Sequence, residues 1–242
     1  MTETQAAESS GIGAIIRGLI EELIGEDKTV IEVPFGNGFF NISSSTVTMW
    51  IIMAVLILIC IILSANLKVY NISKRQAITE SIVVGLRNLV GGFLGHTAIE
   101  YTDFLVVTLV LIGASNLSGV FGATPPTMDL NVTIALALVS ITMVEYAGIK
   151  KRKFGGWLKS FAQPVAIITP MNILEVGIRP LSLCMRLFGN VLGATIIMEL
   201  LKKVAPVIAP AVLSVYFDFF DGLLQAYVFI FLTSLYIKEA TE

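Results

Sequence analysis

The chain has 242 residues, of which 55% are hydrophobic and only 14% are charged, and its formal net charge is −2. Soluble domains carry about 25% charged residues, so the composition excludes an ordinary soluble domain and indicates a polytopic membrane protein. The small net charge gives no support to a nucleic-acid partner. The single histidine, His96, and the two cysteines, Cys60 and Cys184, form no metal-binding pattern. Both cysteines lie in apolar runs, and we expect both to be buried.

The N-terminal part, residues 1–46, differs from a secretory signal because it carries seven acidic and two basic side chains. Residues 11–24 have a weak amphipathic pattern, which predicts a short surface helix. The run Ser43-Ser-Ser-Thr46 is suited to cap a helix that follows it. We therefore expect an extracytoplasmic segment over 1–46 and a single membrane domain over 47–242.

Three apolar segments are long enough to predict membrane-spanning helices, at about 48–67, 101–121 and 130–148. Residues 76–97 instead mix Glu80 and Arg87 with aliphatic residues and glycines, which predicts an amphipathic helix at the membrane interface. Asp129 is expected to cap the helix that begins near Leu130.

Basic side chains gather after the first and third of these spans, at positions 68, 74, 75 and 150–153. Basic loops stay in the cytoplasm. Both clusters therefore predict the same topology, with the N-terminus outside and the C-terminus in the cytoplasm.

The last third of the chain predicts two longer helices, at about 164–203 and 205–238. A helix of about 35 residues would reach roughly 50 Å, which exceeds the ~30 Å hydrocarbon core. We expect these helices to be strongly tilted, kinked or partly lying along the membrane, and to form an antiparallel hairpin. The predicted fold is an all-α polytopic membrane protein with about five transmembrane helices and one interfacial helix.

Each of these two helices carries a polar stripe when residues are placed at about 100° intervals. The first stripe consists of Glu175, Arg179, Ser182, Arg186 and Asn190, and the second of Ser214, Asp218, Asp221 and Gln225. Intramembrane ionisable residues are functional by default, so we interpret the two faces as lining a water-accessible route. A structural network in which the polar faces neutralise one another is the alternative. For Glu175 and Arg179, a local ion pair at the interface is the favoured interpretation. Gly189 and Gly193 form a small-xxx-small pattern that permits close helix packing.

Arg186 is the most informative member of these stripes. A guanidinium stays protonated under all relevant conditions, and its placement at mid-membrane costs at least about 2.5 kcal/mol on insertion scales. Such a charge must face a protein interior or water and serve a purpose there. The pattern favours ion transport.

Several motifs then point to one family. They are Ser115-Asn-Leu-Ser-Gly119, Pro126-Thr-Met-Asp-Leu-Asn131, Pro170-Met-Asn-Ile-Leu-Glu175, Arg179-Pro-Leu-Ser182, Arg186-Leu-Phe-Gly-Asn190 and Leu224-Gln-Ala226. In this order, over residues 48–240, they resemble subunit a of the F-type rotary ATP synthase of the bacterial or chloroplast type.

The resemblance implies a membrane stator that faces a rotating ring of c subunits, each with one carboxyl group, and that offers the ions two offset half-channels. It implies that Arg186 faces the ring carboxylates, favours their ionised form and blocks direct leakage. Gln225 matches the glutamine near that arginine. Asn116 and Asn190 match polar positions of the outer half-channel, and Glu175 matches an acidic residue at the cytoplasmic exit.

Two positions depart from the family pattern. Thr195 stands where many members have glutamate, and Asp218 stands where some members have histidine. Asp218 is therefore expected to supply the channel carboxylate, with help from Asp221. We expect H⁺ as the coupling ion, with Na⁺ as the alternative.

The resemblance also implies partners and a location. The partners are the c-subunit ring, the b subunits of the peripheral stalk, the F1 sector indirectly, and membrane lipid, and the location is the bacterial plasma membrane. No cofactor, metal site or catalytic residue is expected, so the chain is not predicted to be an enzyme by itself.

Three other classes are weaker. A self-contained transporter predicts an internal repeat, and an intramembrane protease predicts a catalytic constellation; the sequence shows neither. A purely structural membrane subunit leaves Arg186 unexplained.

Overall fold

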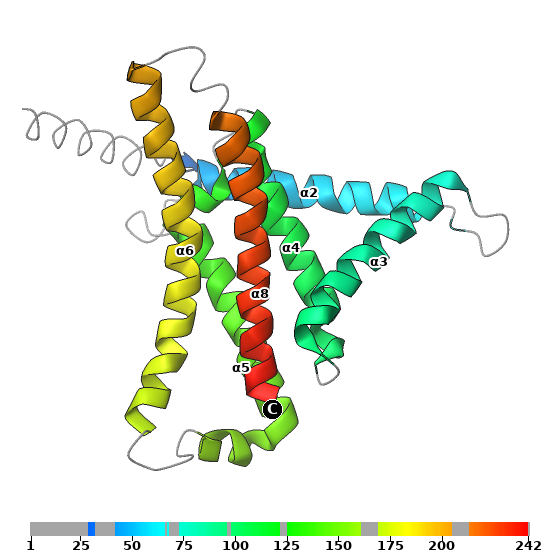
Figure 1. The fold of residues 1–242 in the computed structure, drawn as a ribbon, viewed down its shortest axis with the longest axis vertical. Helices are drawn as coiled ribbons and strands as arrows, with labels where there is room; N and C mark the ends of the chain where they lie inside the picture. The colour runs from blue at the N-terminus through cyan, green and yellow to red at the C-terminus, as the bar shows by residue number, and fades with distance from the viewer. Residues whose placement is uncertain are drawn as a thin grey trace, which may run out of the picture.

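In the computed structural model, the described residues are 29–31, 42–65, 67, 73–95, 98–121, 125–160, 169–204 and 213–241. They form an almost entirely helical structure (Figure 1), which confirms the predicted all-α class. The described ranges also contain a small antiparallel sheet, which the sequence did not predict. It consists of β1 (Thr29–Ile31) and β2 (Ile42–Ser43). The predicted surface helix at 11–24 lies outside the described residues.

Six helical segments in the described ranges are long and apolar enough to cross a membrane. The main helices are α2 (Ser44–Ser64), α3 (Lys74–Leu94), α4 (Thr102–Leu117), α5 (Leu130–Ser160), α6 (Thr169–Val204) and α8 (Gly222–Thr241). Short 3-10 turns flank α4 and α5 at Ile99–Tyr101, Ser118–Phe121 and Pro126–Met128, and a π-helical segment, Val215–Asp221, runs directly into α8. By length and composition α3 is a sixth candidate span, so its interfacial placement stays a prediction.

The two predicted helix caps are confirmed, and one hydrogen bond joins them. The Ser43 hydroxyl accepts from the backbone N–H of Thr46 at 3.3 Å and donates to Asp129 Oδ2 at 2.9 Å. Asp129 Oδ1 in turn accepts from the backbone N–H of Asn131 at 2.8 Å. The first turn of α2 is thereby tied to the first turn of α5, 86 residues later in the chain.

Helices α2 and α3 touch the rest of the molecule only near one end. Met49, near the start of α2, is buried and accepts a hydrogen bond from Ser115 on α4 at 3.4 Å. Beyond this contact most of α2 is exposed, including Cys60. The expectation of two buried cysteines is therefore wrong for Cys60, because no element in the described ranges covers that part of α2, and right for Cys184.

Helix α3 docks through its last two turns, where Val90 is fully buried and Arg87 pairs with Asp103 at 2.8 Å. Leu94 is fully buried, and the ring of Phe93 packs edge-on against Tyr227 and Phe231 of α8 with centroid distances of 5.5 and 5.3 Å. The rest of α3 extends away from the bundle (Figure 1).

The core lies between α4, α5, α6 and α8. Helix α8 packs on both α4 and α5, whereas α6 packs chiefly on α5. The fully buried side chains at the centre are mostly aliphatic, including Leu105, Ile112, Val144, Leu187 and Ile230. Lipid tails are as apolar as these side chains, so close packing rather than exclusion from water holds such a bundle together.

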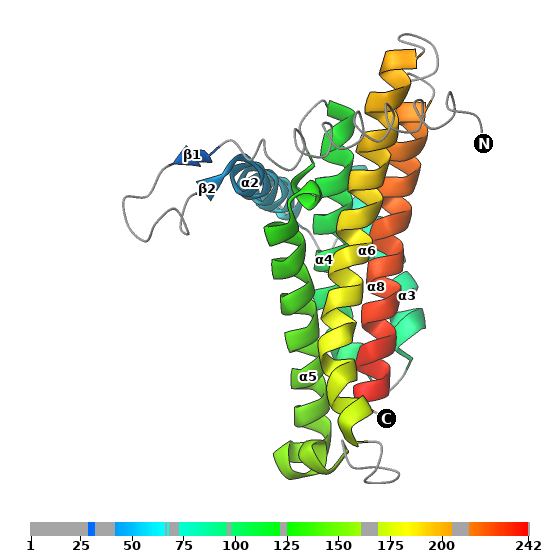
Figure 2. The ribbon, with the colours of Figure 1, turned by 90° about the vertical axis from the view of Figure 1, so that its left-hand side faces the viewer.

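The two long helices of the last third form the expected antiparallel hairpin. Helices α6 and α8 run side by side in opposite directions, and α2 runs across them (Figures 1 and 2). Helix α6 has 36 residues, about 54 Å at 1.5 Å per residue, whereas the 21 residues of α2 match the ~30 Å core. Two helices that cross in this way do not both stand along the membrane normal, and the tilt of the hairpin stays a prediction.

Helix α5 extends further than the predicted span of 130–148. Its axis breaks at Lys153, where the backbone has φ 59° and ψ 158°. This conformation is rare for residues other than glycine and stores about 1–3 kcal/mol of strain. The segment 154–160 therefore leaves the line of α5, as the lower end of Figure 1 shows.

Candidate functional site

Arg186 lies in the middle of α6 and is partly exposed. It forms no ion pair or hydrogen bond with any other side chain in the described ranges, unlike Arg87 and Arg179, which pair with carboxylates. The adjacent face of α6 is uncovered and apolar at three- and four-residue intervals. Its exposed side chains are Met171, Leu174, Ile178, Leu181 and Met185. The permanent charge of Arg186 therefore lies at the edge of an apolar surface that this chain does not cover.

A polar contact joins α6 to α8 one helical turn beyond Arg186. Asn190 Nδ2 donates to Gln225 Oε1 at 2.5 Å. Gln225 is 2% exposed, and its amide Nε2 has no acceptor among the described residues. An unsatisfied buried donor costs about 1–3 kcal/mol. A polar group that accepts a hydrogen bond from Gln225 Nε2 would therefore stabilise this site.

A second polar contact joins α4 to α8. Buried Asn116 accepts from Thr127 Oγ1 at 2.7 Å and donates to the backbone carbonyl of Gly222 at 2.9 Å. The two helices meet closely there, because a Cβ on Gly222 would lie 3.1 Å from the Cβ of Asn116. A larger residue at 222 would force Asn116 to shift by a few tenths of an ångström, and the amide of Asn116 satisfies the carbonyl of the first residue of α8.

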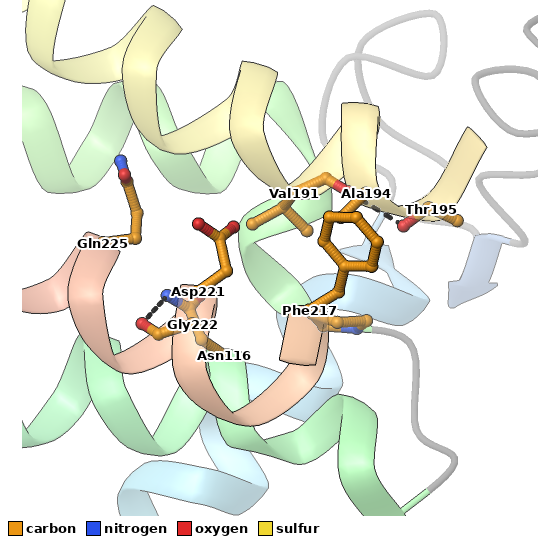
Figure 3. A pocket seen from close by; sticks show the side chains of 9 residues that line it. Asn116, Val191, Ala194, Thr195, Phe217, Asp221, Gly222 and Gln225 are labelled. Carbon is orange, nitrogen blue, oxygen red and sulfur yellow. Dashed lines mark hydrogen bonds between the residues drawn. The ribbon is translucent and has the colours of Figure 1, made fainter. Parts of the chain in front are cut away.

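A small pocket of about 30 Å³ lies between these two contacts (Figure 3). Its lining residues are Asn116, Pro125, Val191, Ala194, Thr195, Phe217, Asp221, Gly222 and Gln225. The carboxylate of Asp221 points into the space between α6 and α8 (Figure 3). A volume of this size accommodates about one water molecule. Thr195, which also lines the pocket, donates its hydroxyl proton to the carbonyl of Val191 at 2.9 Å.

The π-helical segment explains how α8 presents this carboxylate. Gly222 N–H bonds to the carbonyl of Phe217 five residues earlier, so Val215–Asp221 does not follow the 100° spacing on which the predicted stripe depended. The inference that Ser214, Asp218, Asp221 and Gln225 share one face by α-helical spacing is therefore wrong in its geometry. Asp221 and Gln225 nevertheless line the same pocket. The side chain of Asp218 lies outside what the structure describes. Single π-turns occur frequently at functional sites.

A separate charged cluster lies at the other end of the hairpin. Arg179 bonds to Glu175 at 3.0 Å and to Glu239 of α8 at 2.7 Å, and its guanidinium lies 5.0 Å from the ring centre of Tyr236. The predicted local pair of Glu175 and Arg179 is confirmed, and Glu239 adds a link between helices that the sequence analysis missed. Ser182, one turn further along, is partly buried.

Among the described residues, Gly189 and Gly193 make no close helix contact, because a Cβ at either position would meet no heavy atom within 4 Å. The packing role of these two glycines stays a prediction. The close approach occurs at Gly222 instead, and neither Gly222 nor Thr127 was identified from the sequence. The Pro-Thr turn before α5 and the glycine before Leu224-Gln-Ala226 were the available signals.

In the described part of the chain, no group of three or more His, Cys, Asp or Glu side chains is arranged to hold a metal ion. The site is thus a line of amide, hydroxyl and carboxylate groups between membrane helices, next to an arginine with no acidic partner among the described side chains. Fold and site together define a polytopic helical membrane protein with a polar seam in its helix bundle.

Comparison with known proteins identifies the family. Residues 46–238 match the model of the ATP synthase A chain, and the chain belongs to this family. It is 32% identical over 224 residues to the sodium-ion-specific ATP synthase subunit a of Propionigenium modestum, which covers 86% of this chain and 77% of that protein. It is 33% identical to an ATP synthase subunit a of Acaryochloris marina, covering 85% of this chain and 88% of the relative. The corresponding protein of Bradyrhizobium is 34% identical, with 85% and 92% covered.

Proposed function

We propose that this chain is the membrane stator subunit of a rotary ATP synthase and that it conducts ions to and from carboxyl groups on a rotating c-subunit ring. The observation that carries the proposal is Arg186, whose charge has no acidic partner among the described residues and borders an uncovered apolar face of α6. A charge at this depth needs a counter-ion. A carboxylate on a partner that covers this face supplies one, and family membership supports the same assignment.

The partner surface follows from the exposed face of α6. Its apolar side chains recur every three to four residues over four turns, which suits a helical partner that packs along α6. Gly189 is exposed on the same helix, so small residues that make no close contact within the chain are free to admit a helix of the ring. Contacts with the b subunits and the F1 sector belong to the same proposal through the family.

The seam between α6 and α8 is the proposed outer half-channel. From the pocket at Asp221 and Thr195, polar groups continue through Gln225 and Asn190 to Arg186, one turn away. Asn116 supports this line by fixing the start of α8. Asp218, in the same π-helical segment, is retained as a second carboxylate of the entry. The chain thus places a carboxylate at the start of the route and a guanidinium at its end.

The Arg179 cluster marks the proposed cytoplasmic side. Glu175 has a half-exposed side chain and pairs with Arg179, which in turn pairs with Glu239. An acidic, solvent-accessible group near this end is suited to the exit half-channel. Ser182 lies between this cluster and Arg186 on α6. In this orientation the N-terminus is outside and the C-terminus is in the cytoplasm of a bacterial cell.

The proposed coupling ion is H⁺, with Na⁺ as the alternative. The Propionigenium relative is described as sodium-ion specific, and oxygen ligands such as those of Asp221, Thr195 and Gln225 suit either a hydrated cation or a proton-carrying water. Parallel measurement of proton and ²²Na⁺ uptake by the reconstituted complex distinguishes the two.

The decisive experiment replaces Arg186 in the reconstituted ATP synthase. Arg186→Ala should abolish ATP-driven ion uptake into vesicles while the complex still assembles. In Arg186→Lys the rate of ion uptake should fall at least about tenfold, which corresponds to an increase of roughly 1.4 kcal/mol in the activation free energy. The reason is that a lysine lacks the planar fork and deprotonates readily in an apolar site. Arg87→Ala removes an equal charge from an exposed pair with Asp103 and serves as the matched control. Coupled uptake at the control rate in Arg186→Ala would refute the proposal.

A further inference from the structure

The end of α5 carries a concentration of positive charge that the ion route does not use. Lys150, Lys151, Arg152 and Lys153 are consecutive. Lys150 pairs with Glu100 at 2.7 Å, and Arg152 donates to the backbone carbonyl of Glu239 at 3.3 Å. Lys151 and Lys153 form no ion pair with a described residue and are exposed. Two of the four cations are thus held by the protein, and two are presented outward.

The chain turns back immediately after this run. The left-handed backbone at Lys153 ends the axis of α5, and Trp157 fixes the segment that follows. Trp157 Nε1 donates to Glu145 Oε2 at 2.8 Å, and its ring stacks on Phe154 with a centroid distance of 5.8 Å. The direction of segment 154–160 is therefore set by contacts with the preceding turns of α5.

This arrangement exposes large apolar side chains next to the lysines. Phe154 is 65% exposed and Leu158 is 59% exposed, and Tyr146, one turn before the basic run, is 56% exposed. A hollow of about 180 Å³ lies next to Lys150 and Lys151, and its other lining residues are Glu100, Tyr101, Ala147 and Thr241. Aromatic and aliphatic side chains beside a basic run are typical of a segment that lies in the bilayer interface.

We propose that residues 150–158 form a binding site for an anionic phospholipid headgroup, with Lys151 and Lys153 contacting the phosphate and Phe154 and Leu158 entering the acyl boundary. Charge complementarity selects the occupant, because basic clusters directly beside a membrane helix attract anionic lipid. A soluble acidic partner would leave Phe154 and Leu158 in water, whereas a lipid surface accepts the charged and the apolar groups together. The turn at Lys153 brings both kinds of group to the same interface.

Fluorescence of Trp157 provides a direct test, since the chain has two tryptophans and Trp50→Phe leaves Trp157 as the only one. The full chain, purified without the other subunits, would be reconstituted in vesicles of phosphatidylcholine and phosphatidylglycerol at equal mole fractions, with bromine on the acyl chains of one lipid or the other. Trp157 should be quenched more by brominated phosphatidylglycerol. The preference should fall about fivefold for each lysine removed in Lys151→Gln and Lys153→Gln, and it should decrease with added salt.

Two further variants keep the test independent of folding and of ion transport. Lys151→Arg with Lys153→Arg should retain the preference, and Lys202→Gln, which removes an exposed cation paired with Glu199 at the far end of α6, should not change it. Equal quenching by the two lipids in the parent protein would overturn the proposal. So would a preference that survives the loss of both lysines.

Discussion

The carboxylate of Asp221 is the described acidic group that points between the two hairpin helices (Figure 3). It shares a water-sized pocket with Thr195 and with Gln225, whose amide Nε2 has no acceptor among the described residues. A buried amide that makes only one of its possible hydrogen bonds favours a polar occupant of the pocket. In the proposed route, Asp221 would pass an entering ion or water toward Asn190 and Arg186.

Replacement of Asp221 tests this residue-scale argument. Asp221→Asn keeps the size of the side chain but removes the charge, and ATP-driven ion uptake should fall several-fold while the complex assembles normally. The sequence match favours Asp218 as the channel carboxylate, so Asp218→Asn should also slow uptake, and the double variant should be slower than either single one. Initial rates of uptake at several ion gradients measure the effect. Wild-type rates in both single variants and in the double variant would show that neutral groups such as Asn116 and Asn190 suffice.

Close contact between α4 and α8 depends on one glycine. The Cβ of Gly222→Ala would lie 3.1 Å from the Cβ of Asn116 and would push apart the helices that carry the hydrogen bond from Asn116 to the carbonyl of residue 222. Overpacking of this kind costs about 1–3 kcal/mol. We expect Gly222→Ala to lower the unfolding midpoint of the purified chain in mixed micelles.

The matched control for Gly222 lies on α6. Gly193→Ala places its Cβ where no heavy atom lies within 4 Å, and the alanine should raise helix stability by up to about 1 kcal/mol. Circular dichroism during titration with a denaturing detergent measures both variants. A lower midpoint in Gly193→Ala than in Gly222→Ala would contradict the packing described here.

At the scale of elements, the sequence predicts what depends on local pattern and misses what depends on contact. Asp129 was identified as a cap because capping is decided within a few residues. Gly189 and Gly193 were assigned to a packing contact because a small-xxx-small pattern indicates that close approach is possible, but not which helix comes close. The π-helical segment at Val215–Asp221 was missed since it carries the same apolar and polar residues as an α-helix. The sequence assigned Asp221 and Gln225 to one polar stripe, but it did not predict the pocket that they line together.

At the scale of the whole molecule, the helices divide into two groups with different relations to the membrane. Helix α2 has the length of the hydrocarbon core, and the described elements leave most of it uncovered. Helices α6 and α8 run across it (Figure 1) and meet along polar side chains. The Arg179 cluster and the basic end of α5 lie at the end of the bundle that carries the C-terminus, whereas the pocket at Asp221 lies toward the other end. The polar groups are thus separated along the bundle, and this separation is the arrangement that the proposed pair of offset half-channels needs.

This separation has functional meaning only with a defined orientation, which cysteine labelling can establish. Cys60 and Cys184 would first be changed to serine and alanine. A cysteine at Leu130, 42% exposed at the start of α5, should react with a membrane-impermeant maleimide added from outside to intact cells. A cysteine at Lys151 should react only after the membrane is opened, because basic loops stay in the cytoplasm. Thr127 is fully buried and would be a poor reporter at the outer end, which is why Leu130 is the better choice.

Reaction of Lys151→Cys in intact cells would contradict the proposed topology and reverse it. The pocket at Asp221 would then open to the cytoplasm and the Arg179 cluster to the outside.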